Sequence, residues 1–216
     1  TVTEEKNATI NWTTGEIGIV KNNRTITDAY VSDKDGNKVS NDSNYVTIQM
    51  YGSPKEGSPF IYNMLTGLNS WCNPYKLNID LVGALTTNDE EVYTIDIEPS
   101  IDVAGDGKIC PQIANFNIDS FKAKDSNEYH YADYSPEKDD KKNALVIWLH
   151  GGGEGGSDPQ IPLLGNKASN YASEQFQKEM DGAYVLVPQC PSKWMNDETG
   201  KYQYGDKGSI YADGLF

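Results

Sequence analysis

The sequence predicts two domains, an all-β domain followed by the first part of a parallel α/β sheet. Residues 1–112 contain short stretches of alternating apolar and polar residues that are separated by turn residues. Residues 144–149, ALVIWL, form an unbroken apolar run that leads into a glycine-rich loop at 151–156. A second apolar run, YVLV at 184–187, follows a stretch with helical spacing. We therefore assign residues 1–112 to the first domain and 113–216 to the second.

The first domain is predicted to be an immunoglobulin-like β-sandwich. Turn residues, such as DKDGN at 33–37, divide the expected strands, and no segment has a helical period. Trp71 and Tyr75 belong either to the core and corners of the sandwich or to a face on which sugars stack. The expected strands are 9–12, 17–20, 25–31, 45–51, 76–82 and 91–97.

The second domain is predicted to begin with a β-hairpin, strands 116–121 and 128–134 around a turn at 124–127. The apolar run at 144–149 then indicates a strand covered by helices on both faces, because neither face alternates with polar residues. A helix is expected at 166–180, with Gly182 in a left-handed conformation behind it. A parallel strand at 184–187 completes the strand–helix–strand unit.

The loop that follows the apolar run carries the strongest functional signal. Gly151, Gly152 and Gly153 come directly after His150, and glycines let backbone N–H groups turn inward without a Cβ in the way. Such a loop stabilises negative charge, either on a phosphate or on the oxyanion of acyl transfer. The loop has neither a Gly-Lys-Ser/Thr ending nor a Gly-x-Gly-x-x-Gly pattern that opens a helix. An oxyanion hole is therefore favoured over a phosphate site, and a tight connection without chemistry is the alternative.

Two motifs, LVIWLHGGGEGG at 145–156 and YVLVPQCP at 184–191, resemble secreted α/β-hydrolase esterases, together with Trp194. These are relatives of polyhydroxybutyrate depolymerases and feruloyl esterases, and some carry an N-terminal immunoglobulin-like domain. The resemblance implies a hydrolase of carboxylic esters, either short acyl and aryl esters or those of polysaccharides such as plant polysaccharides. Related folds also contain peptidases and polyester depolymerases.

The same resemblance implies roles for individual residues. The backbone N–H of Gly152 is the best single oxyanion donor, with Gly151 and Gly153 beside it. His150 and Glu154 shape the loop, while Gln189 and Trp194 are candidate walls of the substrate pocket. No cofactor and no metal is implied.

The residues that perform acyl transfer are not found in this sequence. It contains no Gly-x-Ser-x-Gly pentapeptide, and its only histidines are His130 and His150. Ser157 and Ser209 have the wrong neighbours and lie in expected loops. We expect the chain to be the N-terminal portion of an α/β-hydrolase and to be inactive alone. It would pair with a missing C-terminal half that supplies the nucleophile and the catalytic histidine and acid, or form a homo-oligomer.

Charge and hydropathy limit the possible partners. The net charge of −14 argues against binding to nucleic acid, because phosphates would be repelled. No apolar run is long enough to span a membrane. These features fit a secreted or cell-surface protein, and we expect a bacterial one. A non-catalytic module that binds carbohydrate or a partner, or that drives oligomerisation, is the alternative from another functional class.

Two further features leave alternatives open. Residues 102–108 could form a calcium loop, but they lack its regular ligand spacing, so a glycine-rich turn is favoured and no metal is predicted. Cys72 and Cys110 could form a disulfide, or these two and Cys190 could be three buried thiols.

Overall fold

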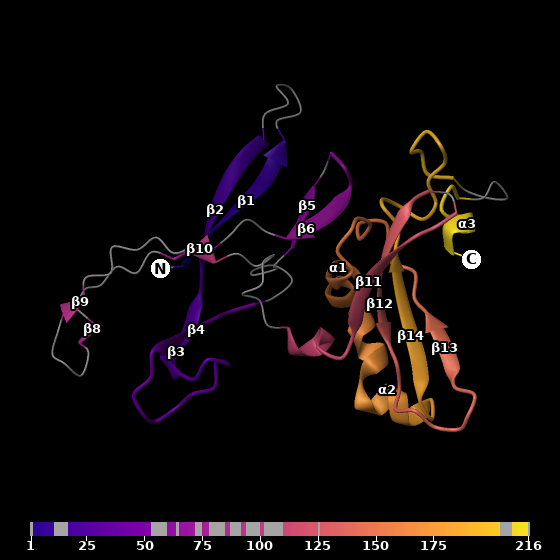
Figure 1. The fold of residues 1–216 in the computed structure, drawn as a ribbon. Coiled ribbons are helices and arrows are strands. Elements are labelled where there is room, and N and C mark those ends of the chain that lie inside the picture. The colour runs from indigo at the N-terminus through magenta and orange to yellow at the C-terminus, as the bar shows by residue number, and fades with distance from the viewer. Residues whose placement is uncertain are drawn as a thin grey trace. The chain divides into compact units, whose positions relative to one another are not determined.

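A computed structural model provides the structure of the chain (Figure 1). It describes residues 2–10, 17–52, 60–63, 65–71, 75–77, 85–86, 92–93, 100–101, 110–124, 126–203 and 209–215. The chain divides into two compact units, Thr1–Ile61 with Trp71–Lys108, and Tyr62–Ser70 with Ile109–Phe216. The second unit therefore includes the short segment Tyr62–Ser70, which lies within the sequence of the predicted first domain.

The described part of the first unit consists of β-strands. One sheet has the order β10-β7-β1-β2, and β3–β4 and β8–β9 form two-stranded antiparallel pairs. The strands predicted at 17–20, 25–31 and 45–51 are confirmed as β2, β3 and β4. Residues 11–12, 78–82, 94–97 and 102–108 and Cys72, on which other predictions depend, lie outside the described residues. The strands are β1 Val2–Ile10, β2 Ile17–Arg24, β3 Ile26–Ser32, β4 Tyr45–Met50, β7 Tyr75–Leu77, β8 Leu85–Thr86, β9 Val92–Tyr93 and β10 Ser100–Ile101.

Two further short strands, β5 Phe60–Asn63 and β6 Leu68–Trp71, pair with each other and enclose a turn. Asn63 forms the turn by accepting hydrogen bonds from the backbone N–H groups of Leu65 and Thr66. Gly67 ends the turn with φ of +69°, a left-handed conformation that favours glycine. This hairpin is absent from the strands expected from the sequence.

The second unit is built on a four-stranded mixed sheet in the order β11-β12-β14-β13. The hairpin of β11, Asn117–Lys122, and β12, Glu128–Tyr134, is antiparallel as predicted. The strands β13, Ala144–Ile147, and β14, Ala183–Gln189, run parallel, which confirms the strand–helix–strand arrangement. Pro188 does not end β14, because it still pairs with Tyr131 of the antiparallel neighbour β12.

The helix predicted at 166–180 is replaced by two shorter pieces, η2 Ala168–Ala172 and α2 Glu174–Glu179. Ser173 separates them, because its backbone is extended and its hydroxyl accepts the N–H of Phe176 as a helix N-cap. Gly182 takes φ of +84°, as predicted for the residue that ends this helical stretch. The remaining helices are η1 Pro111–Ile113, α1 Gln160–Gly165 and α3 Ala212–Leu215.

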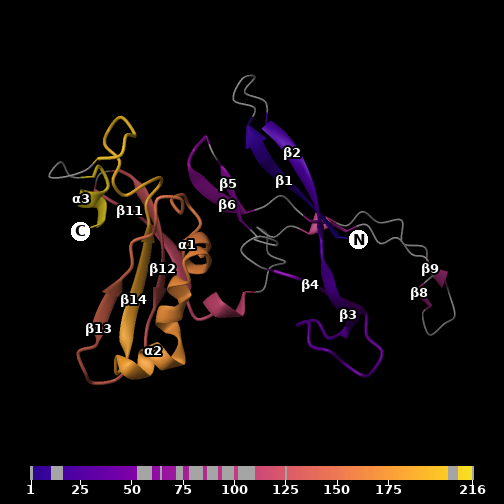
Figure 2. The ribbon, with the colours of Figure 1, turned by 180° about the vertical axis from the view of Figure 1, so that it is seen from behind.

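One face of the sheet, called here the covered face, packs against the helical segments. Val185 and Val187 of β14 are almost fully buried there, and Leu163 of α1 and Ala168 of η2 join the same core. In both ribbon views, α1 and α2 lie along the same side of the sheet (Figures 1 and 2). This packing places the loops at the ends of β13 and β14 on a rigid support.

The opposite face, called here the open face, carries apolar side chains that remain exposed. Leu145 and Ile147 of β13 are 58% and 45% exposed, and Leu149 just beyond the strand is 47% exposed. Tyr184 of β14 is also exposed. The prediction that helices cover both faces of the 144–149 strand is therefore wrong for the described residues. The unbroken apolar run arises from one partly buried row and one exposed row of side chains.

Candidate functional site

The candidate site lies where the two parallel strands end. Loop 150–156 follows β13 and loop 190–194 follows β14, so both loops lie at the carboxyl edge of the parallel pair, where α/β sheets bind ligands. The loops are in direct contact. The N–H of Gly156 donates to the carbonyl of Cys190 at 2.9 Å, and a Cβ on Gly155 would lie only 1.6 Å from the carbonyl oxygen of Ser192. Glycine is therefore required at position 155.

His150 forms hydrogen bonds with both loops. It is 5% exposed, and its Nε2 accepts the backbone N–H of Cys190 at 3.2 Å. Because Nε2 acts as an acceptor, the ring proton is on Nδ1, which donates to the carbonyl of Gly151 at 2.7 Å. Burial lowers the pKa of His150 below its usual value, so the neutral ring is favoured. Both ring nitrogens are occupied, which fits the predicted loop-shaping role.

Glu154 holds the glycine loop from the other side. Its side chain is nearly buried, and Oε2 accepts the N–H of Gly151 at 2.9 Å. Burial raises the pKa of Glu154, while the hydrogen bonds from Gly151 and the Asn166 side chain act in the opposite direction. The Gly151 amide is thus engaged inside the loop. Gly151, predicted as an oxyanion donor, therefore does not have a free N–H for that role.

The anchors of Gly151 also determine the direction of the next amide. The carbonyl of Gly151 accepts from His150 Nδ1 and from the N–H of Glu154 at 3.1 Å, so it points inward. In a planar trans peptide the N–H of the following residue points the opposite way. The N–H of Gly152 is therefore directed outward. Among the residues that the structure describes, no acceptor lies within hydrogen-bond reach of it, and a Cβ on Gly152 would meet nothing within 4 Å.

The two candidate pocket residues lie in different environments. Gln189 is 0% exposed, and its Nε2 donates to the carbonyl of Glu154 at 2.8 Å. This hydrogen bond supports the glycine loop, and a role for Gln189 in the wall of a substrate pocket stays a prediction. Trp194 is partly buried, with ring centroids 5.3 Å from His150 and 6.4 Å from Tyr129. For Trp194 a role in the pocket stays a prediction.

Sequence reasoning missed the contact between the glycine loop and the segment Tyr62–Ser70 of the same unit. The N–H of Asn69 donates to the carbonyl of Gly153 at 2.6 Å. A Cβ on Gly153 would lie 3.2 Å from Asn69 Nδ2 and 3.5 Å from the ring of Tyr62. The asparagine and glycine that flank this turn indicate a hairpin, but nothing in the sequence indicates what the hairpin contacts.

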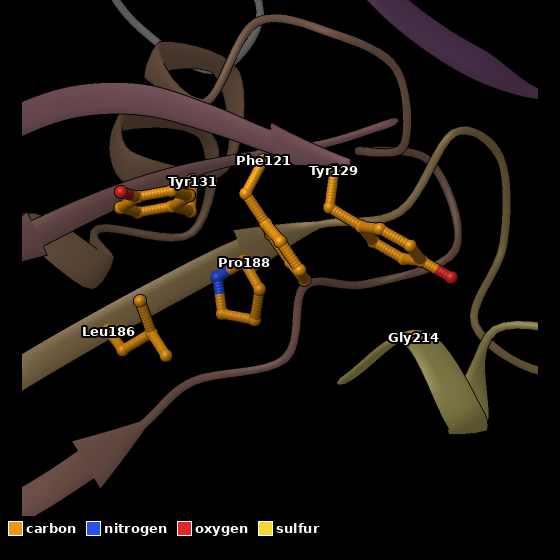
Figure 3. Close-up of a pocket in the computed structure, with 6 residues that line it drawn as sticks. All are labelled: Phe121, Tyr129, Tyr131, Leu186, Pro188 and Gly214. Atoms are coloured by element: carbon orange, nitrogen blue, oxygen red, sulfur yellow. The ribbon is translucent and has the colours of Figure 1, made fainter. Parts of the chain in front are cut away.

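A separate cavity of about 270 Å³ lies on the open face of the sheet (Figure 3). Tyr131 and Phe121 project into it from the β12 and β11 hairpin, and no residue of the glycine loop lines it. The cavity is therefore a feature of the open face and not of the candidate site. Its lining consists of Phe121, Tyr129, Tyr131, Leu186, Pro188 and Gly214.

Within the residues that the structure describes, no group of three or more His, Cys, Asp and Glu side chains is arranged to hold a metal ion. No helix in this part of the chain is long and apolar enough to cross a membrane.

Comparisons with known proteins relate the chain to esterases. Residues 2–94 match the family model for the esterase Ig-like N-terminal domain. The chain is also similar to a solved structure entitled "Crystal Structure of a Thermostable Esterase", with 21% sequence identity and a TM-score of 0.55. That match covers 96% of this chain and 53% of the other, so the chain spans about half the length of the solved esterase. No curated protein matches. The chain therefore has an N-terminal Ig-like β domain, followed by a mixed sheet with short helices.

Proposed function

We propose that this chain supplies half of the oxyanion hole of a carboxylic-ester hydrolase, with the N–H of Gly152 as the donor. The outward direction of this amide, at the carboxyl edge of β13 and β14, is the observation that carries the proposal. His150 holds the carbonyl of the same peptide unit, and Glu154 holds the N–H of the preceding one. The match to the esterase Ig-like N-terminal domain supports the same assignment.

In acyl transfer a serine attacks the ester carbonyl, and the carbonyl oxygen becomes negatively charged. A donor that already points at this oxygen stabilises the charge without reorganising during the reaction. Gly152 provides such a donor, and the second comes from the amide that follows the serine. His150 does not serve as the general base, because both of its ring nitrogens are engaged in the loop. The nucleophile, the catalytic histidine and the acid come from outside this chain.

The edge strand β13 and the open face beside it could pack against the chain segment that carries these catalytic groups. β13 lies at the edge of the described sheet, and its outward side chains Leu145 and Ile147 are exposed and apolar. A further parallel strand beside β13, with its helices over the open face, would bury both residues and bring a serine to the same carboxyl edge. The greater length of the matched esterase supports this arrangement, and a homo-oligomer is the alternative way to cover the face.

The decisive experiment uses a form of the protein that includes the proposed C-terminal half and so has about the length of the matched esterase, called here the esterase-length form. It is assayed with p-nitrophenyl acetate and a serine-directed fluorophosphonate probe. We expect turnover and covalent labelling of the wild type. Gly152→Pro removes the N–H, whereas Gly152→Ala keeps it and adds a methyl group where space is open. The kcat of the proline variant should be about 10²–10³-fold below that of the alanine variant. Equal kcat values for the two variants would exclude Gly152 as an oxyanion donor.

The same assay distinguishes the alternatives. A protein that shows neither turnover nor labelling would instead be a carbohydrate- or partner-binding module. Labelling together with cleavage of peptides or polyesters would assign the loop to those reactions. Secretion and action on esterified polysaccharide remain part of the proposal and are tested by localisation and by substrate panels.

A further inference from the structure

The hairpin segment Tyr62–Ser70 contacts both loops of the candidate site. At one end, the N–H of Asn69 donates to the carbonyl of Gly153 in the glycine loop. At the other end, Gly67 is buried against loop 190–194, where a Cβ would lie 2.7 Å from Lys193 Nζ. The segment belongs to the same compact unit as these loops, although the sequence between them is long. It therefore spans the carboxyl edge of β13 and β14.

The peptide unit between Gly153 and Glu154 is held by two hydrogen bonds, one within the glycine loop and one from Asn69. The N–H of Glu154 donates to Gly151, and the carbonyl of Gly153 in the same peptide unit accepts from Asn69. Without Asn69, only one side of this unit has a partner among the described residues. Three successive glycines give the loop a large conformational entropy, so each external anchor reduces the number of alternative conformations.

We propose that the Tyr62–Ser70 hairpin is a positioning element of the oxyanion-hole loop, and that it acts through the backbone N–H of Asn69. Anchoring the Gly153 carbonyl holds the loop in the conformation that directs the Gly152 N–H outward. The catalytic consequence of this inference rests on the proposed function, whereas the ordering of the loop does not.

Amide hydrogen exchange of the 216-residue chain, followed by NMR, tests the ordering directly. Asn69→Pro removes the N–H, and Asn69→Ala keeps it as the matched control. The Glu154 amide should exchange about tenfold faster in the proline variant, because its peptide unit loses one of its two anchors. In the alanine variant its rate should stay within about twofold of the wild type. The Gly156 amide, bonded to Cys190, is the internal reference and should not change.

A second measurement requires no variant and covers the case in which Asn69→Pro does not fold. In the wild-type chain the hydrogen bond should give a measurable coupling between the Asn69 nitrogen and the Gly153 carbonyl carbon, together with slow exchange of the Asn69 amide. Fast exchange at Asn69 without this coupling would overturn the proposal. An unchanged Glu154 rate in a folded Asn69→Pro variant would overturn it as well.

The catalytic consequence is tested in the esterase-length form. Asn69→Pro should lower kcat for p-nitrophenyl acetate about tenfold and leave KM within about twofold, because a displaced oxyanion donor weakens binding of the transition state but not of the neutral ester. Ser40→Ala, at an exposed residue outside the hairpin, should retain wild-type kinetics. A wild type without ester turnover would refute the proposed function and leave the exchange result standing. An unchanged kcat in an active Asn69→Pro enzyme would refute the positioning role alone.

Discussion

The two faces of the four-stranded sheet differ in how far their apolar side chains are buried. On β14, Val185 and Val187 point to the covered face and are 1% and 0% exposed, whereas Tyr184 points to the open face and is 43% exposed. The same strands are thus packed against helices on one face and leave apolar side chains exposed on the other. The difference indicates that the sheet carries apolar surface for two helical layers, while the described helices supply one.

Exposed apolar surface of this kind usually marks an interface. The exposed side chains are contiguous along β13 and β14, because Leu145 pairs with Tyr184 and Ile147 with Leu186. The aromatic cavity of Figure 3 continues the same face toward β11 and β12. The open face is thus a surface with the composition of a core, and the tests below compare it with the covered face.

The largest effect is expected from a charge placed on the open face beside the proposed new strand. Ile147→Lys should change the unfolding free energy of the present chain by no more than about 0.5 kcal/mol, because the side chain is 45% exposed. In the esterase-length form the same lysine would be buried without a partner, at a cost of about 3–5 kcal/mol. Ester turnover should then be lost.

Ile118→Lys is the matched control for this experiment. Ile118 is 42% exposed and lies on β11 at the far edge of the sheet. Activity should survive this change. If both lysine variants of the esterase-length form are equally active, the open face of β13 is not covered by a further layer.

The second prediction compares truncations on the two faces. Leu163 of α1 is 0% exposed in the core of the covered face, and Leu163→Ala should lower the unfolding free energy by about 2–5 kcal/mol. Leu145→Ala on the open face should change it by less than about 0.5 kcal/mol in the same chain. Urea unfolding monitored by tryptophan fluorescence measures both. Equal destabilisation by the two variants would mean that the open face is already packed in solution.

The sequence could predict the strands of this sheet but not which face is covered. In an apolar run such as ALVIWL every residue appears suitable for burial, so Val146 and Ile147 cannot be told apart by pattern. Their difference depends on which helices are present, and that is a tertiary property. The break between η2 and α2 also escaped prediction, because Ser173 can continue a helix or cap one, and the surrounding structure selects the cap.

The candidate site was predictable to a similar extent. The glycine loop, His150 and Glu154 were recognisable because they are contiguous in the sequence. The engagement of the Gly151 amide by Glu154 was not, since it depends on how one side chain folds back over the loop. Asn69 was missed for a stronger reason. Its contact with Gly153 joins segments that are far apart in the chain. The donor is a backbone N–H, so the residue type at position 69 does not reveal it.

The smallest expected effect is the pH dependence of the unfolding free energy that arises from the buried ring of His150. Burial lowers the pKa of His150 below 6.5, so just below pH 6.5 the unfolded chain binds more protons than the folded chain. The unfolding free energy should therefore fall as the pH decreases from 6.5 toward the folded-state pKa, by up to about 1.4 kcal/mol per pH unit. Well above pH 6.5 the ring is neutral in both states and this dependence vanishes.

Glu154 acts in the opposite direction and must be separated from this effect. Burial raises its pKa above 4.5, so its contribution is present at low pH and is lost as the pH rises through the folded-state value. His150→Gln removes the first contribution and keeps the second, and His130 is common to both proteins, so the difference between the two unfolding curves at pH 7.5 and 5.5 isolates His150. A steeper acid loss in the wild type would show that the neutral ring joining the loops is part of the folded state. Parallel curves would mean that His150 is accessible to protons, and the loop would then lack the fixed tautomer on which the direction of the Gly152 amide depends.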